Sequence, residues 1–197
     1  MLETARNLMV KKGVASITIR GVARAADMTP GNLGYYFSSY DKLLQALLDW
    51  VLDPYLRAFE FLRADVGDDP VASLHAVLNY VLEDLANEDT TMFFPELWVL
   101  ANRGDQAAER MRGLYDTYMS VLKELISAVR PDLSRTHIDE LALFMCASIE
   151  GQTVFIGYER PYAKHRKALK SISLDAMIAA VVNHSGDASV NDAPGTN

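Results

Sequence analysis

The sequence has a single cysteine, Cys146, among its 197 residues, which excludes an internal disulfide framework and is typical of a reducing compartment. Half of the residues are hydrophobic, yet no apolar run approaches the ~20 residues that a membrane-spanning helix needs. The sequence does not open with a basic segment followed by an apolar stretch and a small-residue cleavage site, as a secretory signal would. We therefore expect a cytoplasmic protein without a membrane partner.

Catalytic motifs are missing as well. The sequence contains no nucleotide-binding glycine loop and no HExxH, CxxC or GxSxG motif, and its histidines at positions 75, 137, 165 and 184 are not spaced as metal ligands. A lone cysteine on an apolar helix is typical of packing. We expect no metal, no cofactor and no enzymatic activity. The alternative within this class is an all-α enzyme that uses Glu96 or Glu150 as an acid or base.

The clearest pattern present lies in residues 18–44, TIRGVARAADMTPGNLGYYFSSYDKLL. Thr18 is a hydroxyl N-cap before a short helix with one small apolar face, and Asp27 and Met28 then turn the chain. Thr29 is a second N-cap, and Pro30 takes the first helical position, where its missing N–H has no cost. Two short helices joined by a tight turn predict a helix-turn-helix reader of DNA.

At these residues the chain resembles the TetR family of bacterial repressors, whose signature orders a helix, a turn, a helix that starts at Pro or Gly, and an aromatic cluster. The resemblance covers roughly the first 45 residues. Asp27 stands where the family has Gly, Gly34 where Tyr is most frequent, and Tyr40 where Lys is usual. The resemblance implies an all-α protein with an N-terminal three-helix head and a helical-bundle body that binds a ligand and dimerises.

Residues for DNA contact follow from how such a motif docks, with the second helix in the major groove and the first across the backbone. Asn32 is suited to adenine, while Gly31 and Gly34 would let the backbone approach the duplex closely. The full set of DNA-binding candidates is Arg20, Thr29, Gly31, Asn32, Gly34, Tyr35, Tyr36 and Lys42. For Tyr35 and Tyr36 the alternative is that they only pack the head.

Charge is distributed unevenly along the chain. The formal net charge is −7, but residues 1–48 hold six basic against three acidic residues, and the rest holds 13 basic against 23 acidic. A basic head on an acidic body is the asymmetry expected when one end of a protein meets phosphate.

Beyond the head the periodicity is helical throughout. We divide the chain into a helix-turn-helix domain (1–44), a ligand-binding and dimerisation domain (45–185) and a disordered tail (186–197). Pro54 should kink the helix that begins at Asp41. The further helices are expected at 71–85, from Thr90 or Thr91 to Leu100, and at 108–129, 134–158 and 169–182.

The helix from Ser134 to Tyr158 is apolar on two faces, one marked by Ile138, Leu141, Met145 and Ile149 and the other by Leu143, Cys146, Ala147 and Val154. A helix that is apolar on most sides is buried on most sides, so we expect core on one face and a partner subunit on the other. With the last helix it predicts a homodimer through a four-helix bundle.

The family resemblance implies a ligand cavity within the body. Candidates for its wall are Phe93, Phe94, Trp98, Tyr115, Tyr118, Met119, Phe144 and Glu150. For any one of the apolar residues the alternative is ordinary core. A carboxylate on an apolar helix face is expensive unless it is paired, so Glu150 either receives a ligand or makes a polar contact across the dimer seam.

The function expected from these features is a ligand-responsive repressor. It would bind double-stranded DNA at an inverted-repeat operator as a homodimer and be released by a small-molecule inducer of unknown identity. The alternative is a helical small-molecule sensor that acts through protein partners, with weak or no DNA binding.

Overall fold

The computed structural model describes residues 1–64 and 69–185, and within these ranges every regular element is helical. The expected all-α fold is therefore confirmed. The nine α-helices of this described part are α1 (Leu2–Lys12), α2 (Ile19–Ala25), α3 (Pro30–Tyr36), α4 (Tyr40–Ala64), α5 (Pro70–Asp84), α6 (Glu88–Ala101), α7 (Asp105–Val129), α8 (Arg135–Ile156) and α9 (Arg166–Val182). Two short 3₁₀ turns, η1 (Val14–Ser16) and η2 (Ala163–His165), accompany them.

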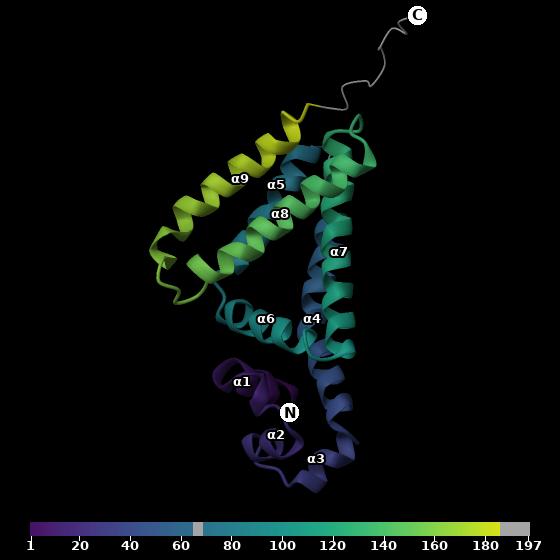
Figure 1. Cartoon of the computed structure of the whole chain (residues 1–197), viewed down its shortest axis with the longest axis vertical. Helices are drawn as coiled ribbons and strands as arrows, with labels where there is room; N and C mark the ends of the chain where they lie inside the picture. The colour runs from purple at the N-terminus through teal and green to yellow at the C-terminus, as the bar shows by residue number, and fades with distance from the viewer. Residues whose placement is uncertain (65–68, 186–197) are drawn as a thin grey trace, which may run out of the picture.

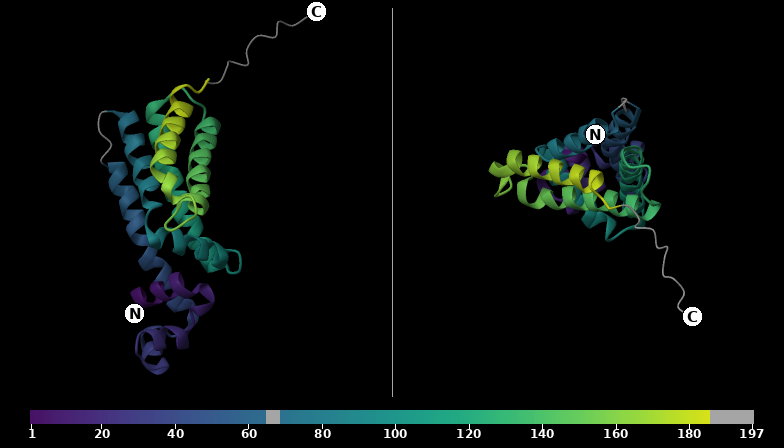
Figure 2. Two further views of the ribbon diagram at one scale, coloured as in Figure 1. Left: turned by 90° about the vertical axis from the view of Figure 1, so that its left-hand side faces the viewer. Right: turned by 90° about the horizontal axis from the view of Figure 1, so that it is seen from above.

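The molecule is elongated, with α1, α2 and α3 forming a head at one end (Figure 1). Helix α4 rises from this head into the body and carries Pro54 within it. The predicted boundary between residues 44 and 45 thus falls inside one continuous helix. In the body α7 runs along the long axis beside α4, and α5, α8 and α9 are inclined to that axis (Figures 1 and 2). Helix α6 lies across the base of the body, next to α1.

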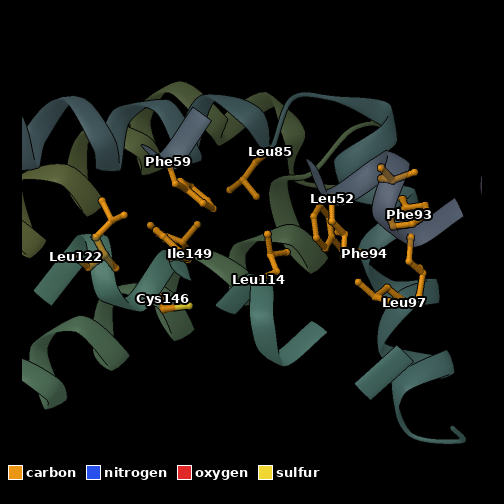
Figure 3. Close-up of a cluster of buried hydrophobic side chains, with 14 of the residues drawn as sticks. Leu52, Phe59, Leu85, Phe93, Phe94, Leu97, Leu114, Leu122, Cys146 and Ile149 are labelled. Atoms are coloured by element: carbon orange, nitrogen blue, oxygen red, sulfur yellow. The ribbon is translucent and has the colours of Figure 1, made fainter. Parts of the chain in front are cut away.

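The body core is built where α4, α6, α7 and α8 meet (Figure 3). Phe59 of α4, Leu122 of α7 and Ile149 of α8 are at most 5% exposed. Burial of such side chains contributes roughly 1.5 to 3 kcal/mol each. The helix patterns read from the sequence follow these inward faces, which is why most of the predicted helices are present.

Helix α6 differs from the expectation that Thr90 or Thr91 caps it. It begins at Glu88, because the Asn87 side chain accepts a hydrogen bond from the Asp89 amide at 3.0 Å. Thr91 instead serves tertiary structure: its hydroxyl oxygen accepts from the Tyr158 amide (2.8 Å), and its O–H donates to the Leu85 carbonyl (3.1 Å). Helix α9 also begins three residues earlier than expected, directly after η2.

The two-faced character of α8 is present, with one correction. Leu143, Ala147 and Val154 are exposed, as a face awaiting a partner should be. Cys146 was expected on that face but is only 7% exposed and belongs to the core, because it lies beside Met145 on the edge that packs against α7. The tail proposed at 186–197 lies outside the described residues. Within the described ranges, no helix is long and apolar enough to cross a membrane.

Candidate DNA-binding surface and ligand cavity

The head is shaped by two capped helices and a tight turn. The hydroxyl oxygen of Thr18 accepts from the Gly21 amide at 2.9 Å, and that of Thr29 accepts from the Asn32 amide at 3.1 Å. Asp27, in the turn between α2 and α3, has φ +54°, a left-handed conformation that Asp tolerates better than most residues. The predicted helix-turn-helix geometry is thereby formed.

The DNA-binding candidates share one property, which is access to solvent. Arg20, Thr29, Gly31, Asn32, Tyr35, Tyr36 and Lys42 are exposed, and Gly34 is partly so. Tyr35 is 86% and Tyr36 59% exposed, so the alternative that they pack the head is wrong. The core of the head is supplied by other side chains, such as Leu33 of α3, which is fully buried.

The open backbone of α3 is a second feature of this surface. A Cβ built on Gly34 would meet no atom within 4 Å, and one on Gly31 would meet only the Thr29 hydroxyl, at 3.9 Å. Neither glycine is required by packing within the described chain, which leaves both positions free for close approach by another molecule.

A cavity of about 40 Å³ lies in the body. Its walls come from five helices, α4 to α8, and six of the fourteen lining residues are aromatic. The residues that line it are Tyr55, Phe59, Tyr80, Val81, Asp84, Leu85, Thr90, Phe94, Leu114, Tyr115, Tyr118, Ile149, Glu150 and Thr153.

A hydrogen-bonded chain of three side chains leads to the polar end of the cavity. Trp98 Nε1 donates to the Tyr115 hydroxyl at 3.1 Å, and the Tyr115 hydroxyl is hydrogen-bonded to the Glu150 carboxylate. Burial raises the pKa of Glu150 to about 7, an effect that the bond from Tyr115 partly offsets. Glu150 therefore lies in the cavity wall.

The cavity candidates named from the sequence divide into three groups. Phe94, Tyr115, Tyr118 and Glu150 line the cavity. Phe93 lies behind Phe94, with ring centroids 6.0 Å apart, while Trp98 and Met119 are partly buried against the core.

Phe144 was also expected in the wall, and this is wrong. Its side chain is 47% exposed, because it projects from the outer side of α8 together with Leu143. Ten lining residues were missed, namely Tyr55, Phe59, Tyr80, Val81, Asp84, Leu85, Thr90, Leu114, Ile149 and Thr153. Tyr55 and Phe59, four residues apart, were part of an apolar stripe that the sequence shows, but nothing in it distinguishes wall from core.

A second polar network joins three helices at the mouth of the cavity. The Thr90 hydroxyl donates to Asp84 Oδ2 at 2.5 Å, and the Thr90 and Tyr55 hydroxyls lie 2.8 Å apart. These residues come from α6, α5 and α4 respectively, and Tyr55 directly follows Pro54. These hydrogen bonds connect the mouth of the cavity to the helix that carries the head.

Helix α6 also holds the head directly. Asp89 pairs with Arg6 of α1 at 2.6 Å, and Glu96 accepts a hydrogen bond from the Val14 amide at 2.6 Å. The same helix contributes Thr90 and Phe94 to the cavity. One element therefore contacts both the cavity and the head.

Comparison with known proteins agrees with this architecture. Residues 1–47 match the family model described as bacterial regulatory proteins, tetR family. An uncharacterized HTH-type transcriptional regulator in the dhlA 5′ region of Xanthobacter autotrophicus is 30% identical over 129 residues, and the alignment covers 64% of this chain and 64% of that protein, less than two thirds of the relative.

Solved structures match over nearly the whole chain. A transcriptional regulator from Rhodococcus sp. Rha1 superposes with a TM-score of 0.76 at 18% identity and covers 92% of this chain and 94% of its own. The transcriptional regulator FadR from Bacillus subtilis, solved in complex with stearoyl-CoA, gives a TM-score of 0.66 at 11% identity and covers 92% and 95%. Residues 1–47 are therefore similar to the head of the tetR family of bacterial regulatory proteins, and the chain shares the all-helical fold of these solved regulators.

Proposed function

We propose that this protein is a transcriptional repressor that binds an inverted-repeat operator as a homodimer and is released by a small molecule in the body cavity. The observation that carries the proposal is the exposed outer face of α3, where Asn32, Tyr35 and Tyr36 project from a well-capped recognition helix. Arg20 and Lys42, exposed near the starts of α2 and α4, supply contacts to the phosphate backbone. Acting on operator DNA, it would work in the cytoplasm.

Release would run through the two helices that contact both cavity and head. Tyr55 and Thr90 link the cavity mouth to α4 and α6, and Glu96 and Asp89 link α6 to the head. A ligand shifts such an equilibrium only by its difference in affinity for the two states. The shifted state is the one in which the two recognition helices of the dimer no longer fit successive major grooves, about 34 Å apart.

Dimerisation is supported by the apolar outer side of α8 and α9. Leu143, Val154, Phe155 and Ile172 are each at least 55% exposed, and this cluster of large apolar side chains marks an interaction surface. A two-fold dimer through this face would bury it and pair the two heads.

The DNA-binding part is tested by selection of duplexes from a random pool. An inverted repeat should emerge. Asn32→Ala should relax the preference at one base position and cost about 1 to 3 kcal/mol there, whereas Arg20→Ala should weaken binding to all sequences. Arg112→Ala, which removes an exposed arginine of α7, is the matched control and should bind as the parent does. An unenriched pool would overturn the repressor and favour a sensor that acts through protein partners.

The dimer is tested by light scattering at micromolar concentration. Ala147→Glu, which places a charge on the outer face of α8, should yield a monomer with a weakened DNA affinity. Ala72→Glu, on an exposed position at the start of α5, should leave the dimer intact. A monomeric parent protein would contradict both the dimer and the inverted-repeat operator.

A further inference from the structure

The charged side chains in the wall of the body cavity are all of one sign. Among the described residues that line it, Asp84 and Glu150 are acidic, and there is no lysine, arginine or histidine. Neither carboxylate is ion-paired with a cation of the described chain, since Asp84 accepts from the Thr90 hydroxyl and Glu150 interacts with Tyr115. Unpaired carboxylates in an apolar enclosure are expensive, so a positive group entering the cavity would be stabilised by both.

The remaining wall is suited to the same type of group. Six aromatic rings face the cavity, from Tyr55, Phe59, Tyr80, Phe94, Tyr115 and Tyr118. Aromatic faces attract organic cations through their quadrupoles, and this attraction is stronger where water is excluded. Two of the rings are already held in place, because Phe59 stacks on Tyr118 with centroids 5.0 Å apart and an interplanar angle of 9°.

Tyr118 provides an independent indication of a polar contact site in the cavity wall. Its side chain is 2% exposed, and its hydroxyl group has no hydrogen-bond partner within the described part of the chain. Buried hydroxyls are normally satisfied, and this one lies in the cavity wall near Glu150, which acts on it electrostatically. A ligand with a polar group at this depth would satisfy it.

The mouth leads outward to a second hollow that shares Tyr55, Tyr80 and Asp84 with the cavity. Its two arginines are neutralised, Arg6 by Asp89 at 2.6 Å and Arg57 by Asp53 at 3.1 Å. Asp84 thus stands as an acid without a cation at the point where the two hollows meet. A positively charged molecule would encounter carboxylates both on entry and at the inner end.

We propose that the ligand of this protein is an amphipathic organic cation, with an ammonium-type group held by Glu150 and the aromatic walls. This inference rests on the proposed function in one respect, that the body cavity is the inducer site. Anionic ligands such as carboxylates, phosphates and acyl thioesters of coenzyme A would find no cationic side chain among the described residues of the wall.

The test uses two probes of nearly equal shape, phenyltrimethylammonium and its neutral isostere tert-butylbenzene, with binding to the full-length protein measured by calorimetry. Because the cavity is small, small probes are the appropriate choice. The cation should bind at least about tenfold more tightly than the isostere, as a desolvated charge contact implies. Glu150→Gln should remove most of this difference, and Asp84→Asn part of it.

The matched control is Glu140→Gln, the same substitution on an exposed residue of α8, which should bind both probes as the parent does. Thermal unfolding of each variant shows that it is folded. A neutral isostere that binds as tightly as the cation, an unchanged cation affinity in Glu150→Gln, or no binding of either probe at millimolar concentration would each overturn the inference. Release of the selected operator DNA is measured separately with both probes. This measurement distinguishes a wrong ligand class from a wrong assignment of the protein as a repressor.

Discussion

Replacing Glu150 by Gln should stabilise the ligand-free protein, and by more at high pH than at low pH. The pKa of this carboxyl is raised from 4.5 to about 7, mainly because burial disfavours the charged form. The raised pKa belongs to the folded state, so the carboxyl loses its proton at a lower pH in the unfolded chain. The free energy of unfolding therefore falls as the pH rises from 4.5 towards 7. The loss levels off above that range.

Its magnitude follows from the size of the shift. At about 1.36 kcal/mol per pKa unit, ionisation of Glu150 lowers the free energy of unfolding by roughly 3 kcal/mol at about pH 8 and by less than about 1 kcal/mol at about pH 5. Gln does not titrate and can still accept the hydrogen bond from Tyr115. The gain in stability of Glu150→Gln should therefore grow by about 2 kcal/mol between these two pH values.

Urea unfolding at one fixed protein concentration is the measurement, because any dimer makes stability depend on concentration. Glu140→Gln, whose carboxylate is exposed, should show no such growth with pH. If the difference between Glu150→Gln and the parent were the same at both pH values, Glu150 would not be a buried acid in the cavity.

Further predictions concern the ligand, the head and its attachment. Phenyltrimethylammonium, whose charge is permanent, should bind more tightly at pH 8 than at pH 6, because Glu150 ionises in that interval. The pKa of Cys146, at about 12, and the pKa values of Tyr55, Tyr115 and Tyr118, which burial raises, lie above that interval. Asp84 is the other carboxylate in the wall, and calorimetry of Glu150→Gln should show an affinity that does not change with pH. Gly21→Ala should lower the melting temperature, since its Cβ would lie 2.4 Å from the Ser16 carbonyl oxygen. Gly34→Ala should raise the melting temperature slightly, because its Cβ would meet no protein atom and Ala favours a helix more than Gly does. The same Cβ would lie on the outer face of α3 and should weaken DNA binding in a mobility-shift assay. Glu96→Ala should leave the Val14 amide unpaired, cost about 1 to 3 kcal/mol, and speed hydrogen exchange at that amide; unchanged exchange would show that this bond does not hold the head.

The helices could be predicted well from the sequence because local signals and the core agree. Thr18, Thr29 and Ser134 each cap a helix as their positions indicated, and Pro30 takes the first turn of α3. The start of α6 was missed because Asn87 is an equally good cap. Thr91 is occupied by contacts with the nearby Leu85 carbonyl and with the amide of Tyr158, which is distant in the chain.

The cavity was only partly predictable. Its wall combines residues from five helices, and the sequence gives no information on which apolar side chains of a helix line a hollow and which fill it. Glu150 could be singled out because a carboxylate on an apolar face is unusual. Asp84 could not, since it lies near the end of α5, where an acidic residue raises no question. Phe144 shows the opposite error, an aromatic residue that serves the outer face of α8.

The fully buried hydroxyl of Thr91 gives α6 a fixed point at its first turn, because it joins the end of α5 and the segment after α8. Motion of α6 would then be a rotation about this point, with a displacement that grows along the helix. Glu96 lies five residues further on, about 7.5 Å along the axis at 1.5 Å per residue. A rotation of about 10° would move it by roughly 1.3 Å, enough to part its carboxylate from the Val14 amide, whereas Asp89, close to the pivot, would keep Arg6. The head would turn while remaining tethered by that ion pair.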